Sequence, residues 1–202
     1  MVGTRSLTDW VGLIAGPGRA RVLQWRFKGL TDSAALEGAH ELRAATMAAG
    51  VLFFVNDRPD IARLVGADGV HVGQDDLDPV DVRAILPEAL IGVSTHNQGQ
   101  FDAANEKPVD YIAVGPVFGT STKLNPDPVV GLEFVSWARG RTAKPLVAIG
   151  GLTLANSPSV IRAGAIGLAV ISGLMHAQDP KVAAAEFHSA LQPEQRGITS
   201  RL

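Results

Sequence analysis

Short apolar runs alternate with helical stretches along most of the 202 residues of this chain, and this alternation limits the folds that it can adopt. Most positions in these runs, apart from the short and more polar first one, are apolar, which is typical of strands that are covered on both faces. Eight runs follow the pattern: RSLT (5–8), RVLQWR (21–26), VLFFV (51–55), GVHV (69–72), LIGVS (90–94), DYIAVG (110–115), PLVAIG (145–150) and GLAVIS (167–172). We therefore predict a single-domain α/β fold, the (β/α)8 TIM barrel, and keep an open doubly wound sheet as the alternative.

Local signals mark the ends of several helices. Residues 32–49 carry apolar side chains at helical spacing, with Thr31 as a candidate N-cap and Gly50 as the stop. Asp78-Pro79 and Asp179-Pro180 each read as a capping acid followed by proline at the first helical position. The apolar face of the last helix is predicted to contain Val182, Ala183, Phe187, Ala190 and Leu191.

The composition excludes several classes of function. A formal net charge of −2 provides no long-range positive field that would favour nucleic acid or an anionic membrane. The chain has no cysteine, so disulfides and thiolate metal sites are excluded. No apolar run approaches the length of a membrane span, and the start, MVGTRSLTDW, lacks the apolar stretch of a signal peptide, so we expect a cytoplasmic protein. We expect the barrel to occupy residues 1–191 and residues 192–202 to form a polar C-terminal tail.

Nearly every predicted strand ends in polar or glycine residues. Active sites of (β/α)8 barrels lie at the carboxyl ends of the strands, so we expect these groups to converge on one mouth. They are Gln24, Arg26 and Lys28; Asn56 and Asp57; Gln74, Asp75 and Asp76; Ser94, Thr95 and His96; Thr120, Thr122 and Lys123; Gly150 and Gly151; and Ser172 and Gly173. The first three share one parity along their strand, which predicts that their side chains face the same way.

The chemistry of this set is coherent. Arg26, Lys28 and Lys123 are cations suited to phosphate oxygens. Asp57 and Asp76 are hard oxygen ligands that could share one Mg²⁺ with a diphosphate. The glycines and serine after the seventh and eighth strands fall where barrels commonly bind a phosphate. The pattern therefore indicates two phosphorylated ligands, a diphosphate with a metal and a monophosphate without one.

Each of these residues also has a purely structural interpretation. Arg26 and Lys28 could belong to a half-buried ion pair inside the barrel, and Asp75 reads as a solvated or helix-capping acid. Gly150-Gly151 could be only a tight turn. His71 lies within an apolar strand and is read as a core or barrel-lining histidine rather than a base. The functional interpretation rests on the convergence of the set and not on any one member.

On these residues the chain resembles the thiamine-phosphate synthase family over roughly residues 7–190. The matching pieces, in this order and spacing, are LQWRFK, FFVNDRPDIARLVGADGVHVGQDD, IGVSTH, DYIAVGPVFGTSTK, GLE, VAIGGL and GLAVISGL. The resemblance implies a (β/α)8 fold that joins hydroxymethylpyrimidine diphosphate to hydroxyethylthiazole phosphate, giving thiamine phosphate and pyrophosphate. It implies small molecules as the partners and leaves a homo-oligomer open. Trp25 and Phe27 depart from the smaller aliphatic or acidic residues that are usual in the family.

The resemblance also implies a role for each matching residue. Diphosphate binding falls to Gln24, Arg26, Lys28, Asn56 and Lys123, and Mg²⁺ binding to Asp57 and Asp76. Ser94 matches a residue near the pyrimidine and its leaving group, so that the implied catalytic residues are Lys28, Ser94 and Lys123. Thiazole binding falls to Thr120 and Thr122, and monophosphate binding to Gly151, Ile171 and Ser172.

Two alternatives to the synthase function remain at this point. A thiazole tautomerase-like enzyme of the same superfamily tends to lack the Gly-Gln-x-Asp and Thr-x-Thr-Lys pieces, and both are present here. That branch also carries a histidine where this chain has Pro116. The other alternative is a non-catalytic phosphate-ligand-binding barrel, against which the full set of diphosphate and metal residues argues.

Overall fold

The computed structural model describes residues 5–120 and 127–192. Within these ranges the chain forms two compact units, one made of residues up to 93 together with 107–110, and the other of residues 94–106 together with those from 111 onward. Each unit is an alternation of parallel strands and helices. The chain therefore has an α/β fold with seven parallel strands in the part that the structure describes.

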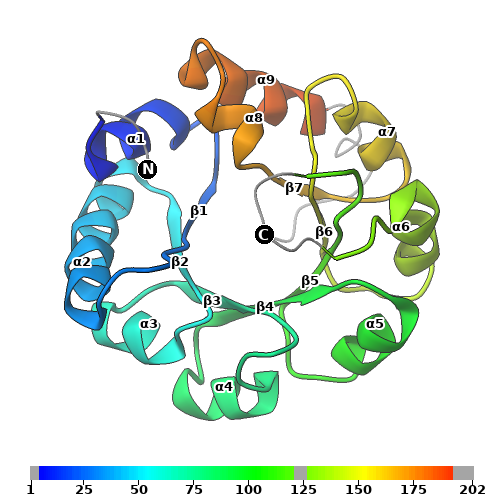
Figure 1. Ribbon diagram of the computed structural model, residues 1–202, viewed down its shortest axis with the longest axis horizontal. Coiled ribbons are helices and arrows are strands. Elements are labelled where there is room, and N and C mark those ends of the chain that lie inside the picture. Colours follow the sequence, from blue (N-terminus) through cyan, green and yellow to red (C-terminus); the bar gives the residue numbers. More distant parts are fainter. Residues whose placement is uncertain (1–4, 121–126, 193–202) are drawn as a thin grey trace. The chain divides into compact units, whose positions relative to one another are not determined.

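The first unit consists of helices and strands that follow one another in the chain: α1 (Leu7–Ile14), β1 (Val22–Trp25), α2 (Asp32–Ala49), β2 (Leu52–Asn56), α3 (Pro59–Val65), β3 (Gly69–Val72), α4 (Pro79–Ile85) and the greater part of β4 (Leu90–Thr95). The four strands pair in parallel in the order β1-β2-β3-β4. Helices α2, α3 and α4 cover one side of these strands (Figure 1). Since parallel strands that follow one another in this order present their carboxyl ends at the same edge, the loops after β1, β2 and β3 are neighbours.

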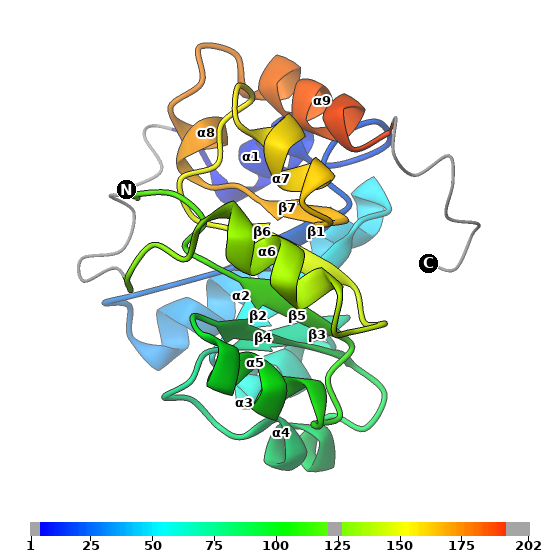
Figure 2. The same ribbon diagram turned by 90° about the vertical axis from the view of Figure 1, so that its right-hand side faces the viewer.

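The second unit begins with the last two residues of β4 and continues with α5 (Gln98–Asn105), β5 (Tyr111–Val114), α6 (Gly131–Arg139), β6 (Leu146–Ile149), α7 (Ser157–Arg162), β7 (Gly167–Ala169), α8 (Ser172–Met175) and α9 (Pro180–Leu191). Its strands pair in parallel in the order β5-β6-β7. Helices α5, α6 and α7 lie one after another over these strands (Figure 2). The loops after β5, β6 and β7 therefore share one edge of this unit.

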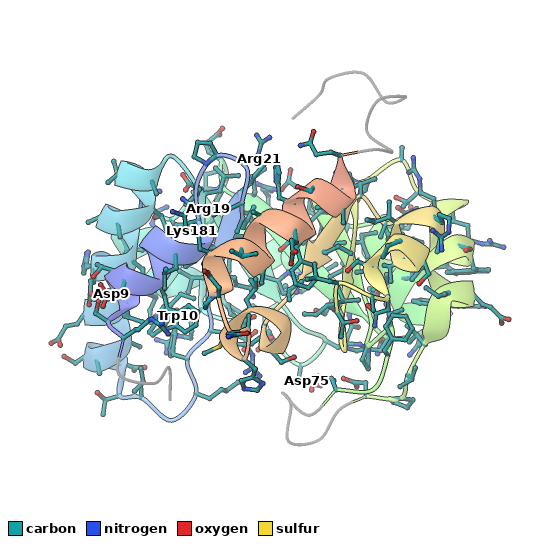
Figure 3. All side chains as sticks on the ribbon, turned by 90° about the horizontal axis from the view of Figure 1, so that it is seen from above. Asp9, Trp10, Arg19, Arg21, Asp75 and Lys181 are labelled. Carbon is teal, nitrogen blue, oxygen red and sulfur yellow. The ribbon has the colours of Figure 1, made fainter. Side chains whose placement is uncertain are left out.

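The predicted first strand, RSLT, is wrong. Ser6 is the N-cap of α1, and the helix begins with a reciprocal capping box: Ser6 Oγ accepts a hydrogen bond from Asp9 N at 3.1 Å, and Asp9 Oδ2 accepts one from Ser6 N at 3.0 Å. Asp9 lies at the surface and Trp10 is buried (Figure 3). The two hydrogen bonds satisfy N–H groups that a helix start leaves open, so this short polar run starts a helix instead of extending as a strand.

The other seven predicted strands are confirmed, with shifts of a few residues at their ends. The largest shift is in the last one, where β7 ends at Ala169 because Ser172 already belongs to α8. The centres of β2, β3, β4 and β5 are buried, as expected for apolar runs covered on both faces, whereas β1 and β7 contain no buried residue. Phe53, Val55, Val70 and Ile91 are examples with no exposed surface, and His71 is only 7% exposed, which confirms its place in the core.

The predicted helix signals are confirmed for three helices. Thr31 caps α2 by accepting from Ala34 N at 3.3 Å, and Gly50 ends that helix in the left-handed conformation. Asp78 and Asp179 accept hydrogen bonds from the first turns of α4 and α9. On α9, Ala183 and Phe187 are buried as expected, but Val182 is 52% exposed, so its assignment to the apolar face is wrong. No helix in residues 5–120 and 127–192 is both long and apolar enough to cross a membrane.

Candidate active site

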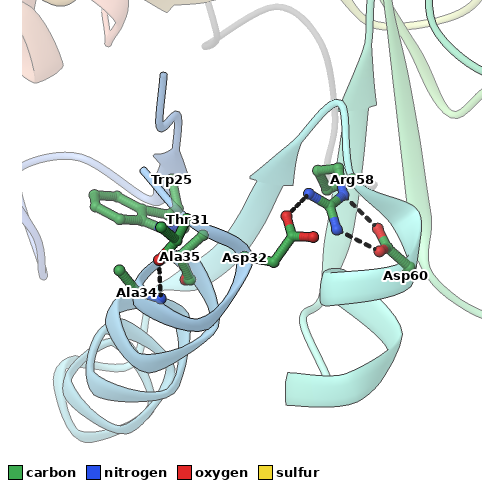
Figure 4. A network of polar contacts seen from close by, with 7 residues as sticks. All are labelled: Trp25, Thr31, Asp32, Ala34, Ala35, Arg58 and Asp60. Carbon is green, nitrogen blue, oxygen red and sulfur yellow. Dashed lines mark hydrogen bonds and ion pairs between the residues drawn. The ribbon is translucent and has the colours of Figure 1, made fainter. Parts of the chain in front are cut away.

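The end of β1 presents three polar side chains on one side of the strand. Gln24, Arg26 and Lys28 are exposed, whereas Trp25 and Phe27 between them are half-buried. The Trp25 ring lies against α2, where its Nε1 donates to the carbonyl oxygen of Ala35 at 3.2 Å (Figure 4). Successive side chains of a strand point to opposite sides, so Gln24 and Arg26 point away from α2. This arrangement agrees with the predicted common face.

The end of β2 lies next to this group. Gln24 Nε2 donates a hydrogen bond to Asn56 Oδ1, and Lys28 Nζ lies 3.4 Å from Asp57 Oδ2. The backbone of Asp57 is left-handed with φ of 63°, and its N–H donates to the carbonyl oxygen of His71 at 2.8 Å. The positive φ turns the chain sharply after the strand. Four of the predicted diphosphate and metal residues therefore lie together in the structure.

Asp76, in the loop after β3, completes the cluster. Its Oδ2 accepts a hydrogen bond from Gly73 N at 2.7 Å. The pKa of Asp57 is raised to about 6, first by burial and then by the hydrogen bond and the charge of the adjacent Asp76 carboxylate, while Lys28 acts in the opposite direction. Two carboxylates that are close enough to share a proton are also close enough to share a cation. Asp75, the neighbour of Asp76 in the sequence, is exposed (Figure 3).

A pocket of about 480 Å³ opens beside the two carboxylates. It is lined by Asp57, Arg58, Pro59, Asp60, Asp75, Asp76, Leu77 and Ile85. Within residues 5–120 and 127–192 no group of three or more His, Asp or Glu side chains gathers as a metal site.

In the second unit, the end of β4 meets the end of β5. Thr95 Oγ1 donates to the carbonyl oxygen of Ala113 at 3.0 Å, and the half-exposed Ser94 comes directly before it. The His96 ring bonds through Nδ1 to the carbonyl oxygen of Gly115, and its Nε2 lies 3.5 Å from Asp127 Oδ2. His96 therefore ties the loops after β4 and β5 together, which is a structural role.

A second pocket, of about 290 Å³, lies among the loops after β5, β6 and β7. It is lined by Gly119, Thr120, Gly151, Leu152, Thr153, Ser172, Gly173 and His176. Thr120, Gly151 and Ser172 were predicted from the sequence and share this pocket. Ile171, which precedes Ser172, is 40% exposed but is not among the residues that line this pocket. Thr122 and Lys123 lie outside the described residues.

Two features of the structure require glycine at position 151. Its φ is +63°, and a Cβ atom there would lie 2.4 Å from the carbonyl oxygen of Gly119. Gly150, with φ of +95°, would place a Cβ 2.4 Å from Pro116 Cβ. The tight-turn interpretation of this pair is therefore confirmed, and the same turn leaves backbone atoms bare at the wall of the pocket.

Several side chains that line these pockets were not predicted from the sequence, among them Arg58 and His176. Arg58 directly follows Asp57, but its hydrogen-bond partners depend on where α2 and α3 begin. His176 lies four residues after Ser172, a spacing that puts two side chains on one face of a helix. This spacing was the available signal for His176.

Comparisons with known proteins agree with the pattern of residues. The model of the family described as thiamine monophosphate synthase matches residues 2–174. A thiamine-phosphate synthase from Koribacter versatilis is 47% identical over 171 residues, covering 84% of this chain and 80% of the relative. One from Chloroflexus aurantiacus is 42% identical over 178 residues, covering 88% and 82%. Among solved structures, a thiamine phosphate pyrophosphorylase from Pyrococcus furiosus is similar with a TM-score of 0.83 and 33% identity, covering 93% of this chain and 90% of that one.

Proposed function

The chain belongs to the thiamine monophosphate synthase family and has the transferase activity of that family, and we propose how its residues carry it out. The substrates are hydroxymethylpyrimidine diphosphate and hydroxyethylthiazole phosphate, and the products are thiamine phosphate and pyrophosphate. The observation that carries the assignment to this site is the contact between Asp57 and Asp76 next to Lys28. A tautomerase or a non-catalytic binding protein has no need for this combination of two carboxylates and a cation.

The first unit binds the diphosphate. Arg26 and Lys28 are exposed cations at the end of β1, and a guanidinium and an ammonium are the side chains that pair best with phosphate oxygens. Gln24 and Asn56 hold each other by a side-chain hydrogen bond, which fixes both amides beside Lys28 and Asp57. Fixed amides and cations together orient a polyanion more strictly than cations alone.

Asp57 and Asp76 are the proposed ligands of Mg²⁺. The donor set fits, because both groups are hard oxygen ligands, and burial together with the neighbouring Asp76 carboxylate raises the pKa of Asp57 to about 6. When bound, Mg²⁺ neutralises charge on the diphosphate as it leaves. Gly73 N donates to Asp76 Oδ2 and so holds that carboxylate in place for the metal.

The second unit binds the thiazole phosphate in the pocket that contains Thr120, Gly151 and Ser172. The left-handed turn at Gly151 leaves no side chain between the backbone and a ligand, so that a phosphate can approach closely. Thr120 and Ser172 supply hydroxyl donors, and His176 adds an imidazole to the same wall. Ile171 and Thr122 remain predicted contacts of the thiazole substrate.

The reaction exchanges one bond for another at the pyrimidine methylene carbon. The C–O bond to the diphosphate breaks, and its electron pair leaves with pyrophosphate. The electron-rich aminopyrimidine stabilises the cation, and the lone pair of the thiazole nitrogen forms the new C–N bond. Lys28, together with the predicted Lys123 and Ser94, stabilises the leaving group. No proton is transferred in the bond exchange, which agrees with the structural roles of His71 and His96.

The proposal extends to the fold and the setting of the enzyme. A barrel of the (β/α)8 type, to which the described residues contribute seven strands, is supported by the likeness to the Pyrococcus furiosus structure. A cytoplasmic location is in keeping with a biosynthetic enzyme of this family. A homo-oligomer stays a prediction.

The experiment mixes both substrates with the protein and Mg²⁺ and measures thiamine phosphate and pyrophosphate together. Equal amounts of the two products are expected, and EDTA should stop their formation. Asp76→Asn should remove the activity, whereas Asp75→Asn, which changes an exposed neighbouring acid in the same way, should keep it. Wild-type protein that forms no thiamine phosphate would refute the function, and equal activity of the two variants would refute Asp76 as a ligand.

A further inference from the structure

Arg58 joins the starts of two helices directly after the proposed metal ligand Asp57. Its Nε and Nη2 donate to the two carboxylate oxygens of Asp60 at 2.8 and 2.6 Å, and its Nη1 donates to Asp32 Oδ1 at 2.7 Å (Figure 4). Asp32 is the first residue of α2, and Asp60 lies in the first turn of α3. The guanidinium therefore connects the end of β2 with both helices through three hydrogen bonds.

This network has little to contribute to the stability of the fold. The side chains of Arg58, Asp32 and Asp60 are 33%, 82% and 57% exposed. Exposed ion pairs typically contribute only about 0–1 kcal/mol. Both acids also lie at helix starts, where a negative charge is favourable without any partner. Stability alone therefore does not explain why the Arg58 guanidinium bonds to both Asp32 and Asp60.

The backbone beside Arg58 supplies that explanation. Within residues 5–120 and 127–192, Asp57 is the one residue other than glycine with a positive φ. Arg58 follows with φ of −120° and ψ of 81°, so that the chain turns again before α3 begins at Pro59. The start of α3 has no side-chain N-cap hydrogen bond. The turn at Asp57 is held on one side by the hydrogen bond from Asp57 N to the His71 carbonyl oxygen on β3. On the other side it is held by the Arg58 side chain, which bonds to the first turns of α2 and α3.

We propose that Arg58 is a positioning residue, which holds the turn at Asp57 so that its carboxylate faces Asp76 in the arrangement that binds the divalent cation. The inference rests on the metal site of the proposed function. Arg58 suits this task because its planar guanidinium fixes three donors in one geometry, whereas lysine offers a single point charge. Residues that orient metal ligands typically change metal affinity by about 10–100-fold when they are replaced.

The test compares Arg58→Met and Arg58→Lys with Arg63→Met. Arg63 is a matched control, because it is an exposed arginine on the same helix whose Nη1 donates to the carbonyl oxygen of Ile85 and not to the network. Mn²⁺ serves as the probe, and its binding to the full chain with pyrophosphate is titrated by electron paramagnetic resonance. The Mg²⁺ concentration that gives half-maximal thiamine phosphate formation is measured in parallel.

Arg58→Met should weaken Mn²⁺ binding by about 10-fold or more and raise the half-saturating Mg²⁺ concentration in proportion. The kcat at saturating Mg²⁺ should recover to within a few-fold, because the ligands themselves remain. Arg58→Lys should fall between wild type and Arg58→Met, and Arg63→Met should match wild type. Unchanged Mn²⁺ affinity in Arg58→Met would overturn the proposal.

The experiment also distinguishes a failure of the variant to fold from a failure of the proposed synthase function. If Arg58→Met does not fold, Asp60→Asn decides, because it keeps Arg58 and removes one charged partner; wild-type Mn²⁺ affinity in Asp60→Asn together with Arg58→Lys would refute the role. If wild type binds Mn²⁺ and Arg58→Met does not, but neither makes thiamine phosphate, the positioning role stands and the synthase function falls.

Discussion

Asp76→Asn is expected to stabilise the metal-free protein near neutral pH although it destroys the metal site. In the wild type, burial and the Asp76 carboxylate raise the pKa of Asp57 from 3.8 to about 6. At neutral pH both groups are charged and repel each other. An asparagine keeps an oxygen that can accept the hydrogen bond from Gly73 N, now made at 2.7 Å, and removes the charge. A change in the stability of Asp76→Asn therefore reports the repulsion between the Asp57 and Asp76 carboxylates.

The size of the expected gain in stability, and the pH range in which it appears, follow from the pKa of Asp57. Because the folded-state pKa is raised, the stability that this group provides is fully present below about pH 4 and is lost as the pH rises through about 6. The whole rise is equivalent to about 3 kcal/mol. Burial is its largest cause, so the share of Asp76 is on the order of 1 kcal/mol, which shifts the Tm of a domain of this size by about 2–4 °C.

Thermal unfolding in EDTA at about pH 5 and about pH 7.5 measures this effect. Asp76→Asn should have a higher Tm than wild type at the higher pH and no such gain at the lower pH, where Asp57 is largely protonated. Asp75→Asn, which changes an exposed acid, is the control. Mg²⁺ with pyrophosphate should then raise the Tm of wild type but not of Asp76→Asn. An equal loss of Tm in Asp76→Asn at both pH values would refute the repulsion.

Three further predictions test other parts of the site and the fold. Lys28→Met should lower kcat by about 10²–10³ in steady-state kinetics, because an electrostatic contact to a leaving group acts in the transition state; an effect confined to KM would contradict that role. His176→Ala should raise the KM for the thiazole phosphate several-fold and leave the KM for the pyrimidine diphosphate unchanged, and the reverse pattern would assign the second pocket to the other substrate. Ser6→Ala should lower the free energy of unfolding by about 1 kcal/mol in urea titrations, as loss of an N-cap does, and an unchanged midpoint would contradict the capping box.

The strands were predictable because each buried parallel strand needs a nearly continuous apolar run. GVHV is an example, since the run and β3 share the same bounds, and all four residues are buried. RSLT failed because only four residues were available, and its polar residues serve the capping of a helix. Ser6 and Asp9 satisfy each other's backbone N–H groups, an interaction that apolar periodicity does not reveal.

The proximity of Asp57 and Asp76 was predictable for a topological reason. Both follow strands that are neighbours in the sequence, β2 and β3, and neighbouring parallel strands end at the same edge. Arg58 could not be found in this way. Its partner Asp32 is 26 residues away, and their contact depends on the first turns of α2 and α3, which a pattern of strand ends does not locate.

Gly151 shows why a structural and a functional interpretation of one residue need not compete. The clash that a Cβ would make with the carbonyl oxygen of Gly119, at 2.4 Å, demands glycine whether or not a ligand binds. The same lack of a side chain exposes backbone atoms to the pocket that Gly119, Gly151 and Ser172 line. A replacement at Gly151 would therefore change the loop and the pocket at once. Residues such as His176, which line the pocket without shaping its backbone, are consequently the ones through which ligand binding can be separated from folding.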